Sequence, residues 1–317
     1  MRQWEFVPEE VAEDYLAACR EVTSNAKMFE NFRKHTGYGR NILEGGSRVV
    51  GEMNLLRLDK VGAFLWLKKN LEAFRDNDKI GNPTLFEFTG VGHMSPSTLQ
   101  YANNSWDILK LTSEKTIVKI VEIGGGYGGL CRILSCIINF NSYIIIDEPD
   151  ALAVAKKYIS YFPEVAHRVQ FISCYDTVAI EALQEIDLAI ACASIAELSY
   201  ETQSFYNQHI LLKAKNFYVT YNTLHIPAGR KSLRNLSKTW RGRFEIDTEI
   251  PWSEILHIYG NADLGQRFFP NIHFFAGYLS PFSEFTGYYS PIQVLVRKGK
   301  TNLKKLKRLV NKISSST

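Results

Sequence analysis

A run of β-branched residues followed by a cluster of glycines constrains the fold of this chain more than any other stretch. Residues 117–123 are rich in isoleucine and valine, and five of the six residues from Gly124 to Gly129 are glycine. A helical pattern of apolar residues begins at Leu130. Branched side chains favour a strand, and glycines let the backbone turn tightly and approach a ligand. The stretch therefore predicts a strand, a tight turn and a helix, with a ligand at the turn.

The glycine spacing is compatible with two classes of cofactor. Gly124, Gly126 and Gly129 match the G-x-G-x-x-G fingerprint of dinucleotide sites. The same stretch also gives Glu122-x-Gly124-x-Gly126-x-Gly128, which begins with a carboxylate. A carboxylate repels a pyrophosphate but attracts the sulfonium and ammonium groups of S-adenosylmethionine. We therefore expect S-adenosylmethionine to bind at Glu122, Gly124, Gly126 and Gly128, ahead of a nicotinamide dinucleotide.

The composition of the chain indicates a globular protein. Its 317 residues are 45% hydrophobic, which suffices for a sizeable core. The sequence has no apolar run of about 18 residues and no secretory signal at its start, so we expect a cytoplasmic protein. The five cysteines are scattered, and we expect them to be buried side chains and no metal to be bound. The net charge of +4 is mild, and we expect no nucleic-acid partner.

The pattern of the first 110 residues predicts an α-helical N-terminal region that caps the site and contacts the substrate. Apolar residues recur there at helical spacing. We expect helices at 8–34, 52–75 and 97–110. The last of these helices and the loop before it directly precede the glycine turn, so the chain can fold back across the cofactor. We therefore expect His93 and Tyr101 to contact the substrate.

Four further strands alternate with helices after the glycine turn. We expect them at 142–147, 169–173, 186–193 and 217–222. Strands that alternate with helices imply a parallel, doubly wound sheet, here of the Rossmann-like α/β class. Ligands of such sheets bind beyond the carboxyl ends of the strands. The sequence thus predicts a cofactor-binding catalytic domain over residues 111–299.

Polar side chains follow the ends of these strands. Asp147 lies about 20 residues beyond the glycine cluster, the separation expected for a carboxylate that binds both ribose hydroxyls. After the third strand, we expect Tyr175 to stack on the adenine or Asp176 to accept from its amine. Ser194 follows the fourth strand and is expected to bind the cofactor. Asn222 follows the fifth strand and is expected to bind the substrate.

If the expected cofactor donates its methyl group to a hydroxyl, a base has to take the hydroxyl proton. Two residues compete for this role. Glu197 follows the fourth strand, where the methyl group is expected to point. His225 follows the fifth strand and has the more suitable unperturbed pKa. We expect Glu197 to be the catalytic base and keep His225 as the alternative.

The last third of the chain differs in character. Residues 268–289 are rich in aromatic side chains, which suit the C–H faces of a sugar but equally form a core. Residues 291–297 predict the antiparallel strand that closes a seven-stranded methyltransferase sheet. The pattern of apolar and basic residues in the tail, residues 300–317, predicts a basic amphipathic helix. It would rest on an anionic membrane surface or be a merely solvated end.

The order of these pieces resembles the sugar O-methyltransferases of bacterial surface-polysaccharide gene clusters. The resemblance covers roughly residues 45–297 and is carried by Val-Glu-Ile-Gly-Gly-Gly-Tyr-Gly-Gly, by Ile-Ile-Ile-Asp-Glu-Pro, by Ser194-x-x-Glu197 and by Tyr221-Asn222. It implies S-adenosylmethionine as cofactor and a sugar or glycan, free, nucleotide-linked or lipid-linked, as acceptor. Glu148 departs from the pattern, because a small apolar residue is expected between the acid and the proline.

Two other functions stay open at this point. A nicotinamide-dependent sugar oxidoreductase would need a Tyr-x-x-x-Lys or similar proton relay, which the sequence does not show. A methyltransferase-like scaffold without activity would not need the complete glycine motif and Asp147 that this chain retains. The sequence also leaves the oligomeric state open, a homodimer included.

Overall fold

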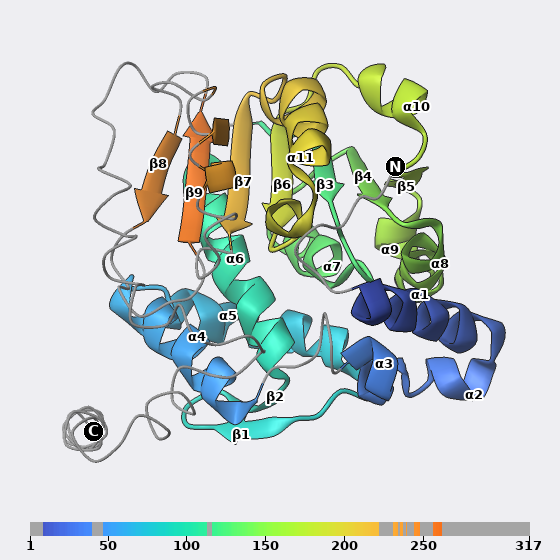
Figure 1. Ribbon diagram of the computed structural model, residues 1–317. Helices are drawn as coiled ribbons and strands as arrows, with labels where there is room; N and C mark the ends of the chain where they lie inside the picture. The colour runs from blue at the N-terminus through green and yellow to red at the C-terminus, as the bar shows by residue number, and fades with distance from the viewer. Residues whose placement is uncertain are drawn as a thin grey trace, which may run out of the picture.

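The computed structural model describes residues 9–39, 47–112 and 116–221, with short stretches at 231–233, 235–236, 239, 244–247 and 256–261. Among these residues the main sheet has the strand order β5-β4-β3-β6-β7-β9-β8 (Figure 1). Its strands are β3 (Lys119–Ile123), β4 (Ser142–Asp147), β5 (Val169–Ser173), β6 (Leu188–Cys192), β7 (Asn216–Tyr221), β8 (Phe244–Asp247) and β9 (Leu256–Asn261).

The five strands from β5 to β7 run parallel, which confirms the parallel α/β sheet predicted from the sequence. β3 lies between β4 and β6, so the direction in which the chain builds the sheet reverses at β3. Ligands of doubly wound sheets bind at such a switch point, beyond the carboxyl ends of the strands. The glycine cluster follows β3 directly and therefore lies at this point.

Two strands extend the sheet beyond β7. β9 pairs antiparallel with β7, and β8 pairs antiparallel with β9. Residues 291–297, expected as the antiparallel strand that closes the sheet, lie outside the described residues, so that assignment stays a prediction. The sequence of β9 contains glycine, histidine and asparagine, which weaken the strand pattern and explain why it was not expected.

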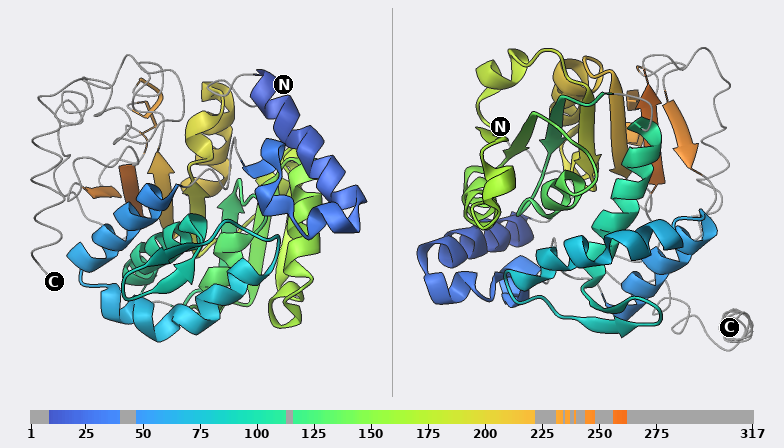
Figure 2. Two further views of the ribbon diagram at one scale, coloured as in Figure 1. Left: turned by 90° about the horizontal axis from the view of Figure 1, so that it is seen from below. Right: turned by 180° about the vertical axis from the view of Figure 1, so that it is seen from behind.

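Helices cover both faces of the sheet. One face packs against α6 (Pro96–Thr112), α7 (Gly129–Ser135) and α8 (Pro149–Ile159), and the other packs against α10 (Thr177–Glu181), α11 (Tyr200–Tyr206) and the π-helical turn η4 (Asn207–Leu211). α11 lies in front of the sheet in Figure 1, and the view from behind in Figure 2 brings α6 forward. Alternate residues of each strand enter the two cores, as for Ile120 and Val121. α9 (Pro163–Ala166) leads into β5.

The N-terminal elements gather along one end of the sheet (Figures 1 and 2). They are α1 (Glu9–Ser24), α2 (Ala26–Phe29), η1 (Phe32–Lys34), α3 (Thr36–Gly39), α4 (Arg48–Lys60), α5 (Phe64–Arg75), η2 (Asp76–Lys79), β1 (Phe86–Phe88) and β2 (Gly92–Met94). α4 and α5 form a core of their own with β1, β2 and α6. Because α6 also packs on the sheet, it joins this region to the rest of the molecule.

Two of the helices predicted for this region are each split. The stretch 8–34 contains α1, α2 and η1, with Asn25 capping α2 through its side chain. The stretch 52–75 contains α4 and α5, separated at Gly62, whose φ is 72°. There the N–H of Ala63 donates to the carbonyl of Leu58, and the N–H of Gly62 donates to that of Asp59, which is the Schellman geometry that ends a helix. Periodicity alone does not detect such a stop.

No helix in the described part of the chain is long and apolar enough to cross a membrane. The division into regions 1–110, 111–299 and 300–317 stays a prediction, and the tail lies outside the described residues.

Candidate cofactor and active site

The glycine turn adopts a backbone that other residues avoid. Gly124, Gly126 and Gly128 have φ values of 72°, 55° and 87°. The N–H of Gly124 donates to the carbonyl of Ile146 on β4 over 2.8 Å, which fixes the start of the turn to the neighbouring strand. A Cβ at Gly124 would overlap the Ser194 side chain. Glycine is therefore required here by both conformation and space.

Ser194 packs on this turn from the end of β6. Its hydroxyl donates to the carbonyl of Ile123 over 2.5 Å, so the side chain binds the last residue of β3. Ala193, just before it, has a φ of 56°, a conformation that is strained for a residue with a Cβ. Its N–H is held by the hydroxyl of Thr220 on β7 at 2.8 Å. Such strain, supported by its surroundings, is typical of functional sites.

Asp147 ends β4 and contacts the turn directly. Its Oδ2 accepts from the N–H of Gly126 over 2.9 Å, and its Oδ1 accepts from the N–H of Glu148 over 2.8 Å. Burial raises the pKa of Asp147 to about 7, although the two backbone donors oppose the rise. A carboxylate has about four acceptor positions, so two remain for ligand hydroxyls.

Glu122 lies beneath the same turn. It is 2% exposed, and a Cβ at Gly125 would lie 3.0 Å from its Oε2. The Tyr143 hydroxyl donates to Oε2 over 2.8 Å. Burial raises the pKa of Glu122 to about 7, and the bond from Tyr143 opposes this. The carboxylate is thus buried close to the turn with a neutral donor as its partner.

A third carboxylate, that of Glu148, is also buried beside Asp147. Burial raises its pKa, while hydrogen bonds from Tyr175 and Cys174 oppose the rise. Among the residues that the structure describes, no lysine or arginine forms an ion pair with any of these three carboxylates. The turn is therefore surrounded by acidic groups that lack a cation from this part of the protein.

The two residues predicted after β5 have local partners. Asp176 caps α10, because its Oδ1 accepts from the N–H of Ala179 over 3.0 Å. Tyr175 is 57% exposed and binds Glu148 through its hydroxyl. Neither bond excludes a contact with adenine, so both roles stay predictions.

The two residues predicted for substrate binding from the N-terminal region are placed differently. Tyr101 on α6 lies at the turn: its ring is 6.0 Å from that of Tyr127, and a Cβ at Gly129 would collide with it. His93 is exposed on β2, paired with Glu87 of β1. No contact within the described residues joins His93 to the turn, so the structure groups Tyr101 with the site and not His93.

Of the two candidate bases, the structure places one. Glu197 ends the 3₁₀ turn η3 (Ile195–Glu197), which follows Ser194, and it is half-buried. His225 and Asn222 lie outside the described residues. Glu197 thus stands on the same strand end as Ser194, which touches the turn.

Two residues at the turn were not expected from the sequence. Tyr127 is fully buried, and Asn77 of η2 donates to its hydroxyl over 3.3 Å. Tyr127 is the only residue of 124–129 with a side chain, and this feature of the sequence could have identified it as a residue that holds the turn. Asn77 is separated from the turn by 50 residues, and no spacing reveals such a partner.

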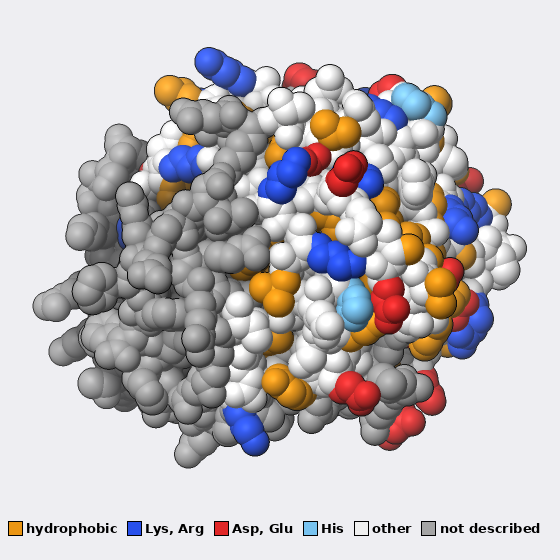
Figure 3. Space-filling view, turned by 90° about the horizontal axis from the view of Figure 1, so that it is seen from above, with side chains coloured by type: hydrophobic (Ala, Val, Ile, Leu, Met, Phe, Trp, Pro, Cys, Tyr) orange, Lys and Arg blue, Asp and Glu red, His pale blue; other side chains and the backbone are white. Residues whose placement is uncertain are grey.

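Other ligand classes find little support in the described residues. They contain no group of three or more His, Cys, Asp or Glu side chains placed to hold a metal ion. Figure 3 shows basic and acidic side chains interspersed over the described part of one face.

Comparison with known proteins gives a distant likeness only. No protein-family model and no curated protein matches the chain. It shares 15% identity with a candidate O-methyltransferase of Nostoc punctiforme, with a TM-score of 0.41, over 51% of this chain and 57% of that one. It shares 16% with human N-acetylserotonin methyltransferase in complex with S-adenosylmethionine (TM-score 0.39; 51% and 52% covered). It shares 14% with TrmK of M. capricolum in complex with S-adenosylhomocysteine (TM-score 0.40; 66% and 94% covered).

The chain spans little more than half the length of the first two of these proteins. At this level of likeness neither a substrate nor a cofactor is transferable to this chain. Its function has to rest on the residues of its own site.

Proposed function

We propose that this chain is an S-adenosylmethionine-dependent O-methyltransferase. The observation that carries the proposal is the set of buried or half-buried carboxylates around the glycine turn, with the half-buried Asp147 bonded to the N–H of Gly126 and the buried Glu122 beneath Gly125. Uncompensated buried carboxylates favour a ligand that brings positive charge. S-adenosylmethionine supplies an electrophilic methyl group, a sulfonium and an ammonium, and its ribose has the hydroxyls that Asp147 can accept from.

The same geometry disfavours a dinucleotide. In a pyrophosphate site the glycine N–H groups of the turn donate to phosphate oxygens. Here the N–H of Gly126 donates to a carboxylate, and a second carboxylate lies under the turn. A pyrophosphate would have to displace one negative group and remain near the other.

We further propose that the acceptor is a sugar hydroxyl of a surface glycan or of its nucleotide-linked or lipid-linked precursor. The support for this finer statement is the sequence resemblance described above, which includes Ser194-x-x-Glu197. The aromatic stretch 268–289, which would suit a sugar ring, lies outside the described residues.

Glu197 is the base of this proposal. It follows Ser194 and the strained Ala193, so the strand end that touches the turn also presents a carboxylate. Its role would be to take the proton of the acceptor hydroxyl as the new bond to carbon forms. His225 is the alternative base.

The first experiment is calorimetric titration with S-adenosylhomocysteine, NAD and NADP. We expect micromolar binding of S-adenosylhomocysteine alone. Binding of a nicotinamide nucleotide alone would overturn the proposal in favour of a sugar oxidoreductase, and binding of none would favour a scaffold.

The base is tested once an acceptor is found by mass spectrometry of reaction mixtures. Glu197→Gln should lower turnover about 10² to 10⁴-fold and leave the affinity for S-adenosylhomocysteine unchanged. The same loss in His225→Gln, with Glu197→Gln active, would transfer the role to His225.

A further inference from the structure

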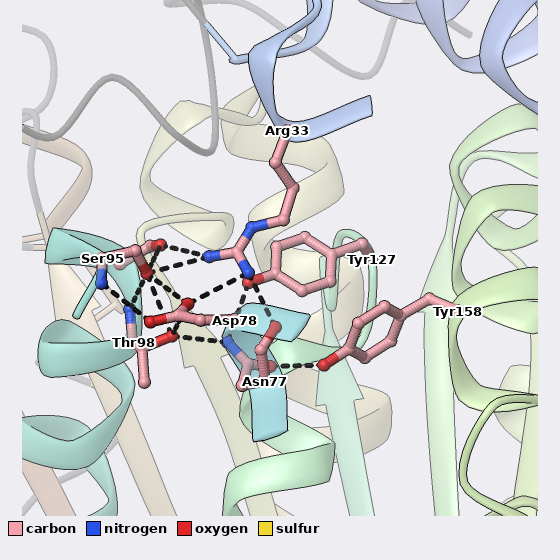
Figure 4. A network of polar contacts seen from close by, with 8 residues as sticks. Arg33, Asn77, Asp78, Ser95, Thr98, Tyr127 and Tyr158 are labelled. Atoms are coloured by element: carbon pink, nitrogen blue, oxygen red, sulfur yellow. Dashed lines mark hydrogen bonds and ion pairs between the residues drawn. The ribbon is translucent and has the colours of Figure 1, made fainter. Parts of the chain in front are cut away.

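Tyr127 is the one residue of the glycine turn, residues 124–129, that has a side chain of its own. Residues 124–129 are otherwise glycine. The Tyr127 ring is fully buried and points toward Arg33 and Asn77 of the N-terminal elements (Figure 4). It packs edge-on against Phe32 of η1 and Tyr158 of α8, with centroid distances of 5.4 and 4.9 Å, and the Arg33 guanidinium lies 5.1 Å from its centre.

Asn77 binds Tyr127 and three other parts of the fold. Its Nδ2 donates to the Tyr127 hydroxyl over 3.3 Å and to the Thr98 hydroxyl of α6 over 2.7 Å. Its Oδ1 accepts from the Tyr158 hydroxyl over 2.5 Å, and its backbone carbonyl accepts from Arg33 over 2.7 Å. Asn77 is fully buried and joins η2, α6, α8 and the turn (Figure 4).

A buried ion pair fixes Asn77 in place. Arg33 and Asp78 are 3.2 Å apart, and both are nearly inaccessible to water. Asp78 also accepts from the hydroxyls of Ser95 and Thr98 over 2.6 and 2.7 Å. A fully bonded buried network allows few alternative arrangements, so the N-terminal elements present Asn77 to the turn in one position.

We infer that Asn77 and Tyr127 are positioning residues that couple docking of the N-terminal elements to cofactor binding at the glycine turn. The inference rests on the proposed cofactor. Tyr127 follows Gly126, whose N–H holds Asp147, so a shift of the Tyr127 side chain moves the backbone that the cofactor approaches. Coupling of this kind is reciprocal: if docking improves binding, the bound cofactor strengthens docking by the same factor.

The test compares two variants, Tyr127→Phe and Tyr158→Phe, each of which removes one tyrosine hydroxyl that is bonded to Asn77. Tyr127→Phe keeps the ring beneath Arg33 and removes the hydroxyl that Asn77 binds in the turn. Tyr158→Phe removes the other phenol hydroxyl bonded to Asn77, and it keeps both the ring that packs on Tyr127 and the bond from Asn77 to the Tyr127 hydroxyl. We expect Tyr127→Phe to weaken S-adenosylhomocysteine binding about three- to tenfold, the worth of one hydrogen bond, and Tyr158→Phe to stay within about twofold of the wild-type chain.

Hydrogen exchange supplies a readout that a purely structural role would not change. In the wild-type chain, saturating S-adenosylhomocysteine should slow exchange of amides in 76–79 and 95–98 by a similar factor, and in Tyr127→Phe this protection should be lost. Equal affinities of the two variants, or no ligand-dependent protection in the wild-type chain, would overturn the inference while the proposed function stands. Failure of the wild-type chain to bind S-adenosylhomocysteine would overturn both.

Discussion

Buried carboxylates occur in two regions of this molecule, and their partners differ. In the N-terminal region, Asp78 of η2 pairs with Arg33 of η1, and Asp107 of α6 pairs with Arg57 of α4 at 2.9 Å. At the carboxyl ends of β3 and β4, Glu122 and Asp147 are held by a phenol and by backbone N–H groups. The carboxylates of the first region each pair with an arginine, whereas no lysine or arginine of the described residues pairs with Glu122 or Asp147.

This difference in partners distinguishes carboxylates that stabilise the fold from carboxylates that can bind a ligand. A buried ion pair whose donors and acceptors are all bonded neither needs nor attracts a ligand. A buried carboxylate with neutral partners keeps a proton near pH 7, and a bound cation lowers the free energy of its ionised form. Carboxyl groups with raised pKa values beside the glycine turn therefore indicate a binding site, and carboxyl groups paired with arginine do not.

The largest expected effect is on folding, in the paired region. Asp107→Leu removes the partner of Arg57 and leaves a buried guanidinium uncompensated. We expect the free energy of unfolding in urea to fall by about 3–5 kcal/mol. The double variant Arg57→Met/Asp107→Leu should recover most of this loss, because both charges are removed. A single-variant cost below about 1 kcal/mol would erase the distinction between the two regions.

The next effect is on binding, at the turn. Asp147→Asn removes the charge and one acceptor that the ribose hydroxyls would use. We expect the affinity for S-adenosylhomocysteine, measured by calorimetry, to fall about 30- to 100-fold, since bonds to charged acceptors are worth about 1.5–3 kcal/mol. Asp150→Asn is the matched control: Asp150 is on the adjacent helix and pairs with Arg20, so its loss should change affinity by no more than about twofold. Equal effects of the two substitutions would show that net charge alone matters.

Glu122 gives a smaller effect, on stability, with a sign set by its pKa. Burial raises this pKa from 4.5 to about 7, so between these values the folded chain keeps a proton that the unfolded chain has lost. The contribution of Glu122 to the free energy of unfolding is thus fully present below about pH 4.5, is lost as the pH rises to about 7 and does not change above that.

Glu122→Gln stays neutral and still accepts from Tyr143. At pH 8 it should be more stable than the wild-type chain by about 1–3 kcal/mol, with most of the gain gone at pH 5. Urea unfolding at both pH values is the measurement. A gain independent of pH would mean that burial does not raise the pKa of Glu122.

Much of the carboxyl-end region could be predicted from sequence because its signals are local. Branched runs gave β3 to β7, and the spacing of Glu122, the glycines and Asp147 gave the turn and its acid. The contacts among the N-terminal elements and α6, called the N-terminal junction here, could not be predicted in the same way. Its partners, such as Arg57 and Asp107, are 50 residues apart, and a helical pattern does not specify which polar residue faces which.

The short elements failed for a related reason. The pattern of 52–75 continues across Gly62, and only its left-handed backbone and the two hydrogen bonds around it end the helix. Strand β2 has three residues, too few for a periodicity of two to be recognised. Glu148 was noticed only as a departure, and its burial beside Asp147 emerges from the fold.

The smallest predicted effect is the pH dependence of binding by the wild-type chain. If the cofactor needs Asp147 ionised, the proton that Asp147 holds below its pKa of about 7 must leave when the ligand binds. Affinity for S-adenosylhomocysteine should then be level above pH 7.5 and fall by up to about tenfold per unit below pH 6.5. Calorimetry at pH 6.5 in buffers of different ionisation enthalpy should show proton release to the buffer, and Asp147→Asn should abolish it. S-adenosylmethionine, which adds the sulfonium charge near Glu122, should release more protons than S-adenosylhomocysteine, and Glu122→Gln should remove that difference. Equal proton release by the two ligands in the wild-type chain would mean that the sulfonium does not face Glu122, and the second carboxylate would then belong with the structural charges of the N-terminal junction.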